Sequence, residues 1–478
     1  MTPVPAGQAV CFAVRRGDVT DRLDVGSFSP ALNAWRTAIA KGSIQPHKVA
    51  EVIDNIRYGT GSPPPRVEPS PDSAPFLRAT DIKDGQVLTG NLPHISRLQP
   101  PFMDKCRLEG NELIIVRSGV NTGDCAVVPL ELNGAFAAYD LILTINKTKA
   151  MPEFISACLY TGFGRAQIDS VKNRAAQPHI NAEEVKSLEI PLPPLDVQRR
   201  LVEELDAARA ERDGAMAEAE DIPAQLDVQI LAEMGIGAPI KDTRETYALK
   251  LSAIRGTRLD ASYHHPRFLK ALRALNQGIG DKTILGTILL DISGGATPRA
   301  GDAALYASDG IKFLRILNVK PNRIELTDLN FIREEVHEGL LKRSQLIAND
   351  VLMTITGRVG TAAVVSDDHL PANINQHIVR LRIDTNRCLP RYLAAYLNTS
   401  IGMLLSNRPV SGGTRIALDY GSIRQIPVLL PSIKKQKRIV ELVQKLLTEE
   451  TRLRSQAETI WQEARARFEQ QLLQGDNP

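Results

Sequence analysis

The sequence carries one eight-residue pattern twice, and this duplication constrains the fold more than any other feature. FLRATDIK begins at Phe76 and FLRILNVK at Phe313, an offset of 313 − 76 = 237 residues. Solenoid units are only about 20 to 50 residues long, so this offset indicates two duplicated domains. Five further pairs of segments keep the same order: RLD at Arg22 and Arg258, GTGSPP at Gly59 and GGATPR at Gly294, IIVRSGVNTGDCAVV at Ile114 and LMTITGRVGTAAVV at Leu352, MPEFISACLYTGFG at Met151 and LPRYLAAYLNTSIG at Leu389, and IPLPPLDVQRRLVEEL at Ile190 and IPVLLPSIKKQKRIVELV at Ile426.

Composition indicates an ordinary globular chain. Hydrophobic residues make up 43% and charged residues 24%, and the net charge is only +3. Binding of a polyanion would therefore depend on local basic patches. No stretch approaches the roughly 20 apolar residues of a membrane span, and no secretory leader precedes the repeat, so we expect a cytoplasmic protein. The scattered cysteines lack a CxxC pair, which predicts reduced core residues and no zinc site: Cys11, Cys106, Cys125, Cys158 and Cys388.

The first part of each repeat predicts a mixed sheet with long connections. Short β-branched runs alternate there with Gly, Pro, Asn and Asp clusters. The Pro-rich stretch 62–75 is expected to form a surface loop, unable to hold a helix or a central strand. Proline at a first helical position favours short helices over 152–160 and 390–397. The predicted strands are 113–117, 141–145, 351–356 and 378–383.

The second part of each repeat predicts a long amphipathic helix. Apolar residues recur at alternating spacings of four and three, as in a coiled coil, and Arg212 and Glu450 are the only charges in their series. Gly214 and Pro223 are expected to weaken or bend the first helix. The predicted seams are Leu201, Leu205, Ala208, Arg212, Ala215, Ala219, Ile222 and Leu226 in the first helix, and Ile439, Val443, Leu446, Glu450, Leu453, Ala457, Ile460 and Ala464 in the second.

Each apolar seam needs a partner, because a lone amphipathic helix is unstable in water. One interpretation is that each helix packs on its own domain. The other is that the two repeated helices pair with each other, most simply antiparallel, and hold two globular modules at a fixed distance. The alanines in both seams suit a close approach of two helices.

The motifs of several enzyme classes are missing. No GxxxxGK[ST] loop is present for ATP, and no NPPY or DPPY tetrapeptide for amino methylation. Glu184-Val185-Lys186 fits the tail of a nuclease E-x-K motif, but an exposed helix turn explains it more simply. His264-His265 beside Asp260 resembles a metal site, but the first repeat has Ser27 and Phe28 in that region, which favours a loop or core role. We therefore assign no catalytic residue and no metal ligand.

A polar, basic loop closes the globular part of each repeat and favours recognition. VKNRAAQPHIN begins at Val171 and NRPVSGGTRIALD at Asn407. Arg and Lys attract phosphates, whereas Asn, Gln, Ser and Thr position the backbone or read base edges. A merely solvated loop is the alternative. Divergent polar loops on a repeated framework are what a two-site reader requires.

These motifs together resemble the specificity subunit of type I restriction-modification systems. The resemblance covers nearly the whole chain and is strongest in the I-P-L-P-P-x-x-x-Q-R-R-L-V phrase at Ile190 and its counterpart at Ile426. It implies an α+β architecture of two pseudo-repeated mixed α/β target-recognition domains, each followed by a long helix, with the helices forming an antiparallel coiled coil. The implied domains are 1–190 with an extension at 1–17, a central helical spacer at 191–236, a second recognition domain at 237–425, and a C-terminal helical spacer at 426–478.

The resemblance also implies a division of labour. This chain reads a split sequence in double-stranded DNA, and two modification subunits holding S-adenosylmethionine methylate adenine at N6. A restriction subunit using ATP and Mg²⁺ cleaves. No cofactor is expected in this chain itself. A self-contained DNA methyltransferase or nuclease, and a coiled-coil scaffold without a DNA role, remain alternatives.

Specific side chains are expected to contact the DNA. Lys and Arg contacts to phosphates fix the register, and polar side chains then discriminate bases. The candidates in the first repeat are Lys83, Arg117, Lys172, Arg174, Gln177 and His179, and those in the second are Arg299, Lys320, Arg358, Asn375, Gln376, Arg408, Thr414 and Arg415.

Overall fold

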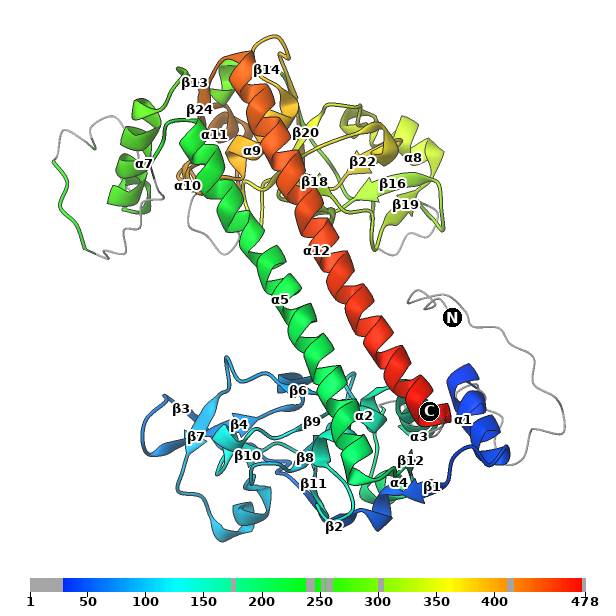
Figure 1. The fold of residues 1–478 in the computed structure, drawn as a ribbon. Coiled ribbons are helices and arrows are strands. Elements are labelled where there is room, and N and C mark those ends of the chain that lie inside the picture. Colours follow the sequence, from blue (N-terminus) through cyan, green and yellow to red (C-terminus); the bar gives the residue numbers. More distant parts are fainter. Residues whose placement is uncertain are drawn as a thin grey trace. The chain divides into compact units, whose positions relative to one another are not determined.

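The computed structural model describes residues 29–172, 178–237, 246–250, 254, 261–299, 305–410 and 417–474. The chain divides into two compact units (Figure 1). The first comprises Met1–Gly214 with Gln456–Pro478, and the second comprises Ala215–Ser455. Each unit therefore contains one sheet-rich domain and a stretch of each long helix.

The first unit is built on two four-stranded sheets and two strand pairs. One sheet has the order β2 (Ile53–Tyr58), β11 (Leu141–Ile145), β8 (Leu113–Ile115), β9 (Cys125–Val127), and the other β10 (Phe136–Ala137), β4 (Ser73–Leu77), β7 (His94–Ser96), β3 (Arg66–Val67). The pairs are β1 (Pro46–Lys48) with β12 (Glu189–Pro191), and β5 (Ile82–Lys83) with β6 (Gln86–Val87).

The second unit repeats this plan strand for strand. Its sheets have the orders β14 (Leu289–Gly294), β23 (Ile378–Ile383), β20 (Val351–Thr354), β21 (Ala362–Val364), and β22 (Ala372–Ile374), β16 (Ile311–Leu314), β19 (Asn330–Ile332), β15 (Tyr306–Ala307). The pairs are β13 (Asp281–Ile284) with β24 (Pro427–Leu430), and β17 (Val319–Lys320) with β18 (Arg323–Ile324). β4 pairs parallel with β10 and β16 parallel with β22, in otherwise antiparallel sheets. The predicted duplication and the mixed sheets are confirmed.

Helices surround these sheets. In the first unit they are α1 (Pro30–Ala40), α2 (Pro152–Tyr160), α3 (Gly162–Lys172) and α4 (Ala182–Lys186), and in the second α7 (Pro266–Gln277), α8 (Glu334–Glu338), α9 (Pro390–Leu397), α10 (Ser400–Asn407) and α11 (Tyr420–Arg424). The long helices are α5 (Leu195–Glu233) and α12 (Ile433–Gln474). α2 and α9 have the predicted bounds, and each has proline in its first turn. β11 and β23 also match, whereas β8 and β20 end two residues early.

The prediction that the Pro-rich stretch 62–75 holds no central strand is wrong. β3 lies within this stretch, and β4, an interior strand, includes Pro75. The register explains why proline is tolerated. Phe76 donates its N–H to the carbonyl of Pro93 on the β7 side (2.8 Å), so the nitrogen of Pro75 faces the opposite edge. β10 pairs with β4 only from Phe76 onward, so proline removes no ladder hydrogen bond there.

In the first unit, the start of α5 packs against the end of α12. Leu201, Leu205 and Ala208 share one core cluster with Phe468 of α12 and Phe154 of α2. The direction is antiparallel, since Glu204 approaches Gln471, whereas Arg212 lies over the ring of Trp461 (4.6 Å to the centroid). The two interpretations of the seam therefore both apply: the helices pack on each other and on the first repeat.

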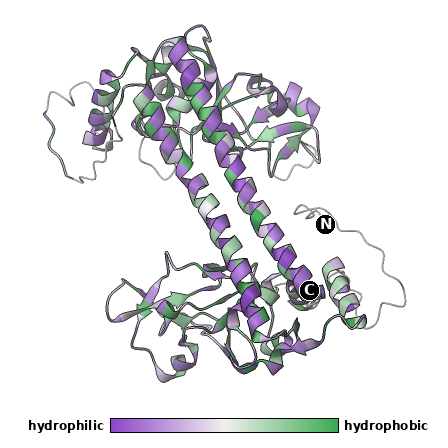
Figure 2. Ribbon diagram, viewed as in Figure 1, coloured by the Kyte–Doolittle hydropathy of each residue, from purple (hydrophilic) through white to green (hydrophobic). Residues whose placement is uncertain are grey.

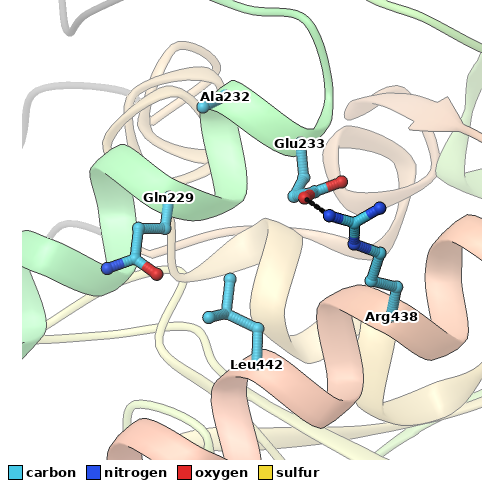
Figure 3. Close-up of a pocket in the computed structure, with 5 residues that line it drawn as sticks. All are labelled: Gln229, Ala232, Glu233, Arg438 and Leu442. Atoms are coloured by element: carbon cyan, nitrogen blue, oxygen red, sulfur yellow. Dashed lines mark ion pairs between the residues drawn. The ribbon is translucent and has the colours of Figure 1, made fainter.

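In the second unit, the end of α5 lies beside the start of α12, again antiparallel. Arg438 pairs with Glu233 (3.1 Å), and the two line a pocket with Gln229, Ala232 and Leu442 (Figure 3). Figure 2 shows hydrophilic and hydrophobic residues alternating along both helices, as such a seam requires. The predicted antiparallel pairing is confirmed in each unit.

Two details of the helices differ from simple expectation. The heptad pattern places Ile460 in the seam, but Ile460 is half-buried and the neighbouring Trp461 is buried, with the seam continuing through Ala464, Phe468 and Leu472. α5 also continues as a helix through Gly214 and Pro223, so neither residue ends it, whereas the expected weakening or bend stays a prediction.

A buried glutamine joins the first long helix to its repeat. Oε1 of Gln198 accepts the N–H of Met151 (2.9 Å). Its Nε2 donates to the carbonyls of Pro193 (2.8 Å) and Lys149 (3.3 Å). The glutamine is completely buried, so these bonds satisfy polar atoms that water does not reach.

Gln436 forms the same arrangement in the second repeat. It accepts the N–H of Leu389 (2.8 Å) and donates to the carbonyls of Pro431 (2.9 Å) and Arg387 (3.0 Å). The glutamine of the repeated I-P phrase therefore fixes how each domain meets its helix.

Candidate nucleic-acid interface

The connections from β8 to β9 (residues 116–124) and from β20 to β21 (residues 355–361), which we call the glycine turns, each meet the polar, basic loop of the same repeat. Ser118 forms an antiparallel bridge with His179, and Thr356 forms one with Ala417. Ile180 also donates its N–H to the carbonyl of Arg117 (2.9 Å), and Leu418 donates to Ile355 (3.0 Å). Two segments about 60 residues apart in sequence are thus held side by side at the end of β8 and of β20.

A third segment joins each of these junctions. The chain crosses from β10 to β11 through residues 138–140, and from β22 to β23 through 375–377, which we call the crossover turns. They lie against glycines that close approach requires. A Cβ at Gly59 would be 1.8 Å from the carbonyl oxygen of Ala138, and one at Gly295 2.0 Å from that of Ile374. Any other residue at these two positions would push the crossover turn away.

The first crossover turn forms an aromatic cluster around Arg117. The guanidinium of Arg117 lies 4.2 Å from the ring centroid of Tyr139 and 5.1 Å from that of Tyr58. Tyr139 is 46% exposed, so its ring is available for stacking. Within the part of the chain that the structure describes, nothing accepts a hydrogen bond from the buried Nε of Arg117.

Asp140 is buried at the base of this cluster. Its Oδ1 accepts the N–H of Arg117 (3.1 Å), whereas Oδ2 has no donor among the described residues. Burial raises the pKa of Asp140 to about 6, and the hydrogen bond from Arg117 only partly opposes this rise. The first module therefore has an ionisable group at the edge of its candidate interface.

We predict that this carboxyl makes stability depend on pH. The unfolded pKa is about 4, so ionisation destabilises the folded state as pH rises from about 4 through about 6, by roughly 3 kcal/mol in total. Asp140→Asn keeps the Oδ1 acceptor and should remove this loss. Urea unfolding near pH 4 and near pH 7 measures it. The exposed Asp72→Asn is the control, and equal pH dependence in wild type and Asp140→Asn would contradict the prediction.

The second crossover turn forms a chain of polar side chains instead. Thr297 donates to Oε1 of Gln376, and Nε2 of Gln376 lies 3.0 Å from Nε2 of His377. Nδ1 of His377 is 2.8 Å from the hydroxyl of Thr356 in the glycine turn. Gln376 is exposed, so this series of hydrogen bonds holds an accessible amide in one orientation.

The structure places some of the predicted residues at these junctions. Arg117 and His179 come together in the first repeat. In the second, Gln376 belongs to the crossover turn, Arg358 is exposed in the glycine turn, and Arg299 is exposed two residues after Thr297. Asn375 is buried, and its Oδ1 accepts the N–H of His377 (3.1 Å), so it supports the turn from within.

Other predicted residues lie elsewhere or are occupied. Lys172 pairs with Asp169 (2.6 Å) and is largely covered. Arg408 stacks on the ring of Tyr263 (4.2 Å). Lys83 and Lys320 lie on the β5–β6 and β17–β18 hairpins, and the second hairpin contacts α12 through Arg323 and Glu450. Arg174, Gln177, Thr414 and Arg415 lie outside the described residues.

Residues that reasoning from sequence missed are Tyr58, Tyr139, Asp140, Thr297, Thr356 and His377. A signal was available: residues 138–140 and 375–377 fall between aligned strands and differ completely between the repeats. Divergence inside a repeated framework marks positions that packing does not dictate.

The other candidate motifs have structural roles. Glu184 accepts the N–H of Asn181 in the capping box of α4 (3.0 Å). His265 caps α7 by accepting the N–H of Arg267 (3.2 Å), and His264 is buried. Asp260 and Cys11 lie outside the described residues, whereas the four other cysteines are buried and free, as predicted. No described helix is long and apolar enough to cross a membrane.

Comparisons with known proteins give a consistent result. The family model described as "Type I restriction modification DNA specificity domain" matches residues 62–213 and 289–459. The EcoBI specificity subunit of Escherichia coli is 24% identical over 306 residues, which cover 62% of this chain and 57% of that protein. The StySPI specificity subunit of Salmonella potsdam is 25% identical over 386 residues, covering 78% and 75%. A chain in a solved structure of a type I R-M system has the same fold, with a TM-score of 0.53 and 17% identity, covering 91% of this chain and 98% of that one.

Proposed function

The chain belongs to the type I restriction-modification DNA specificity family, and we propose that it reads a split target in double-stranded DNA, one half with each repeat. One observation supports this most directly. Both repeats bring a glycine turn, a crossover turn and a polar loop together on the same strand framework, with different side chains. A constant frame with variable side chains suits two modules that read two different sequences.

The first module offers stacking and charge. Arg117, packed against the rings of Tyr58 and Tyr139, could bind a guanine edge or a phosphate, since a guanidinium binds both bidentately. Packing against two rings limits its rotamers, so less entropy is lost on binding.

The second module offers an oriented amide. A glutamine amide can bind the N6 and N7 edge of adenine bidentately. The hydrogen bond that Oε1 accepts from Thr297 and the one that Nε2 donates to His377 fix which side of Gln376 carries the oxygen and which the nitrogen. Pre-orientation of this kind favours one base over the others.

Partners would supply the chemistry. In this proposal two modification subunits carry S-adenosylmethionine and methylate adenine at N6, and a restriction subunit uses ATP and Mg²⁺ to cleave. The paired helices dock the modification subunits and set the spacing of the two half-sites. The naming of the relatives as specificity subunits supports this role, and this chain would contribute recognition without catalysis.

Mapping of adenine methylation in host DNA tests the proposal. The expected result is a two-part methylated motif that disappears when this gene is deleted and returns when it is supplied again. If the partner modification subunit is expressed and no methylated motif changes, the proposal is wrong. Purified chain that methylates or cuts DNA alone would establish the self-contained enzyme instead.

Replacing Gln376 with alanine should relax one base position in one half-site. The expected loss of discrimination is about 1 to 3 kcal/mol, or about 5- to 150-fold between the preferred base and its competitors at that position. Methylation mapping of the variant measures this loss. Gln277→Ala at the end of α7, also exposed, is the control and should leave the motif unchanged. Relaxation of the other half-site as well would show that Gln376 acts structurally.

A further inference from the structure

A basic pocket lies in the second unit, beside the strand that follows the crossover turn. It has a volume of about 710 Å³ and lies beside β23 and the segment after α8. Its apolar lining residues are Leu346, Ile347, Leu370 and Pro371, and its polar lining residues are His337, Lys342, Arg343, Gln345, Arg380 and Arg382.

The strand geometry accounts for the two central arginines. Arg380 and Arg382 are two residues apart on β23, so both side chains point to the same face of the sheet. Arg382 pairs with the buried Asp350 (2.9 Å). Arg380 pairs through Nη2 with Asp291 (2.7 Å), which is itself half exposed.

Arg380 is left with unused donors. It is only 4% exposed, and within the described ranges nothing accepts a hydrogen bond from its Nε or Nη1. Unsatisfied buried donors on a charged group are costly, and a water, an ion or a ligand that accepts from them removes this cost. Lys342 and Arg343 at the rim are exposed and form no ion pair with any described residue, so they add uncompensated positive charge.

The first repeat shows the same framework without this feature. Glu112 stands directly before β8 as Asp350 stands before β20, and both are buried. The arginine beside Glu112 is Arg57, and all three of its nitrogens are bonded, to Glu112 and to the carbonyls of Lys105 and Arg107. The position of Arg380, opposite Leu352, is filled in the first repeat by Ile142, which stands opposite Ile114, so only the second repeat has an arginine with unbonded donors at this point of the fold.

We propose that this pocket, centred on Arg380, binds a phosphate group of the DNA backbone. The inference rests on the proposed function, because it places the phosphate on the duplex that the second module reads. A guanidinium fork flanked by two exposed cations suits the tetrahedral oxygens of a phosphodiester. His377 of the crossover turn is three residues before Arg380, about 10 Å along an extended strand, which corresponds to about three base steps of DNA. Lys342 and Arg343 reorient to admit the phosphate to the covered Nε and Nη1 atoms.

Salt dependence of DNA binding by the full chain provides the test. The probe is a DNA duplex that contains the two-part motif found by methylation mapping. Two variants remove the site: Arg380→Met, and the surface double variant Lys342→Gln with Arg343→Gln, which leaves the buried pairs intact. The slope of log binding constant against log salt should become less steep by about 0.9 for each phosphate that the variant no longer neutralises, with unchanged motif preference. Lys434→Gln with Lys437→Gln, two exposed lysines of α12, removes equal charge and should keep the wild-type slope.

Outcomes other than a less steep slope in the two site variants alone contradict the proposal, each in a distinct way. An unchanged slope in both site variants, or an equal change in the control, overturns the pocket as a DNA contact. Inorganic phosphate, compared with sodium chloride at equal ionic strength, provides a second arm without DNA. If it raises the melting temperature of wild type but not of Arg380→Met while the DNA slopes are unchanged, the pocket holds free phosphate and the DNA assignment is wrong. Failure of the proposed function itself appears differently, as wild-type chain that binds no duplex.

Discussion

Replacement of Trp461 with alanine is expected to lower the free energy of unfolding by about 3 to 5 kcal/mol, the range for removing a large aromatic side chain from a core. Trp461 is 5% exposed in the seam between α5 and α12. The guanidinium groups of Arg212 and Arg209 lie 4.6 Å and 5.2 Å from its ring centroid. Tyr160 stacks at 6.2 Å and accepts a hydrogen bond from Arg209 (2.7 Å). The guanidinium of Arg465 lies 6.0 Å from the same ring, so the substitution removes apolar burial and three cation–π contacts together.

Urea unfolding followed by circular dichroism measures this loss, and hydrogen exchange in residues 456–474 locates it. Ile460→Ala is the matched control, because Ile460 is the adjacent residue and is only half-buried. It should cost less than about 2 kcal/mol. A larger cost for Ile460 than for Trp461 would mean that the seam follows the simple heptad spacing.

Replacement of Glu450 with alanine should cost about 3 kcal/mol. Glu450 is a buried carboxylate on α12 that accepts hydrogen bonds from Arg323 of β18 (2.8 Å) and Arg454 (3.0 Å). Breaking a buried pair by removing one partner typically costs about 3 to 5 kcal/mol. The low end applies because both arginines are about 40% exposed and regain water.

The adjacent Glu449 is the control for Glu450. It pairs with Arg452 (2.6 Å), but both partners are exposed to water, so Glu449→Ala should cost far less than Glu450→Ala. Equal losses in the two variants would show that Glu450 contributes no more than a surface pair. The double variant Glu450→Leu with Arg323→Met should recover most of the lost stability, since an apolar pair needs no charge compensation.

The framework could be predicted from the sequence because its determinants are local or repeated. Proline at the start of α2 and α9 and β-branched runs at β11 and β23 fix those elements through backbone preferences alone. Because the domain is duplicated, each of these sequence patterns occurs twice at equivalent positions, which strengthens the prediction. Pro75 was misjudged because its tolerance depends on where β10 begins to pair, which is a property of the sheet.

The candidate interface was only partly predictable, for a physical reason. Basic and polar residue types suggested Arg117 and Gln376 as candidates, but not the rings of Tyr58 and Tyr139 against which Arg117 packs. Lys172 has the same charge, but it forms an ion pair with Asp169 one helical turn away and is not free to bind DNA in this arrangement. Sequence shows which groups are present, whereas availability depends on contacts between distant segments. The heptad spacing likewise could not show that three arginines gather around Trp461.

The buried glutamines at the two helix starts bear on how such a protein can evolve. Gln198 and Gln436 form their hydrogen bonds with backbone groups of the preceding domain. Because both repeats have this glutamine, the connection between domain and helix depends on no other side chain that differs between them. A hybrid gene that joins the recognition part of one repeat to the helix of the other would therefore still close this joint. Recombination between the two repeats, or with a related gene, would thus exchange one recognition domain while preserving its connection to the long helix.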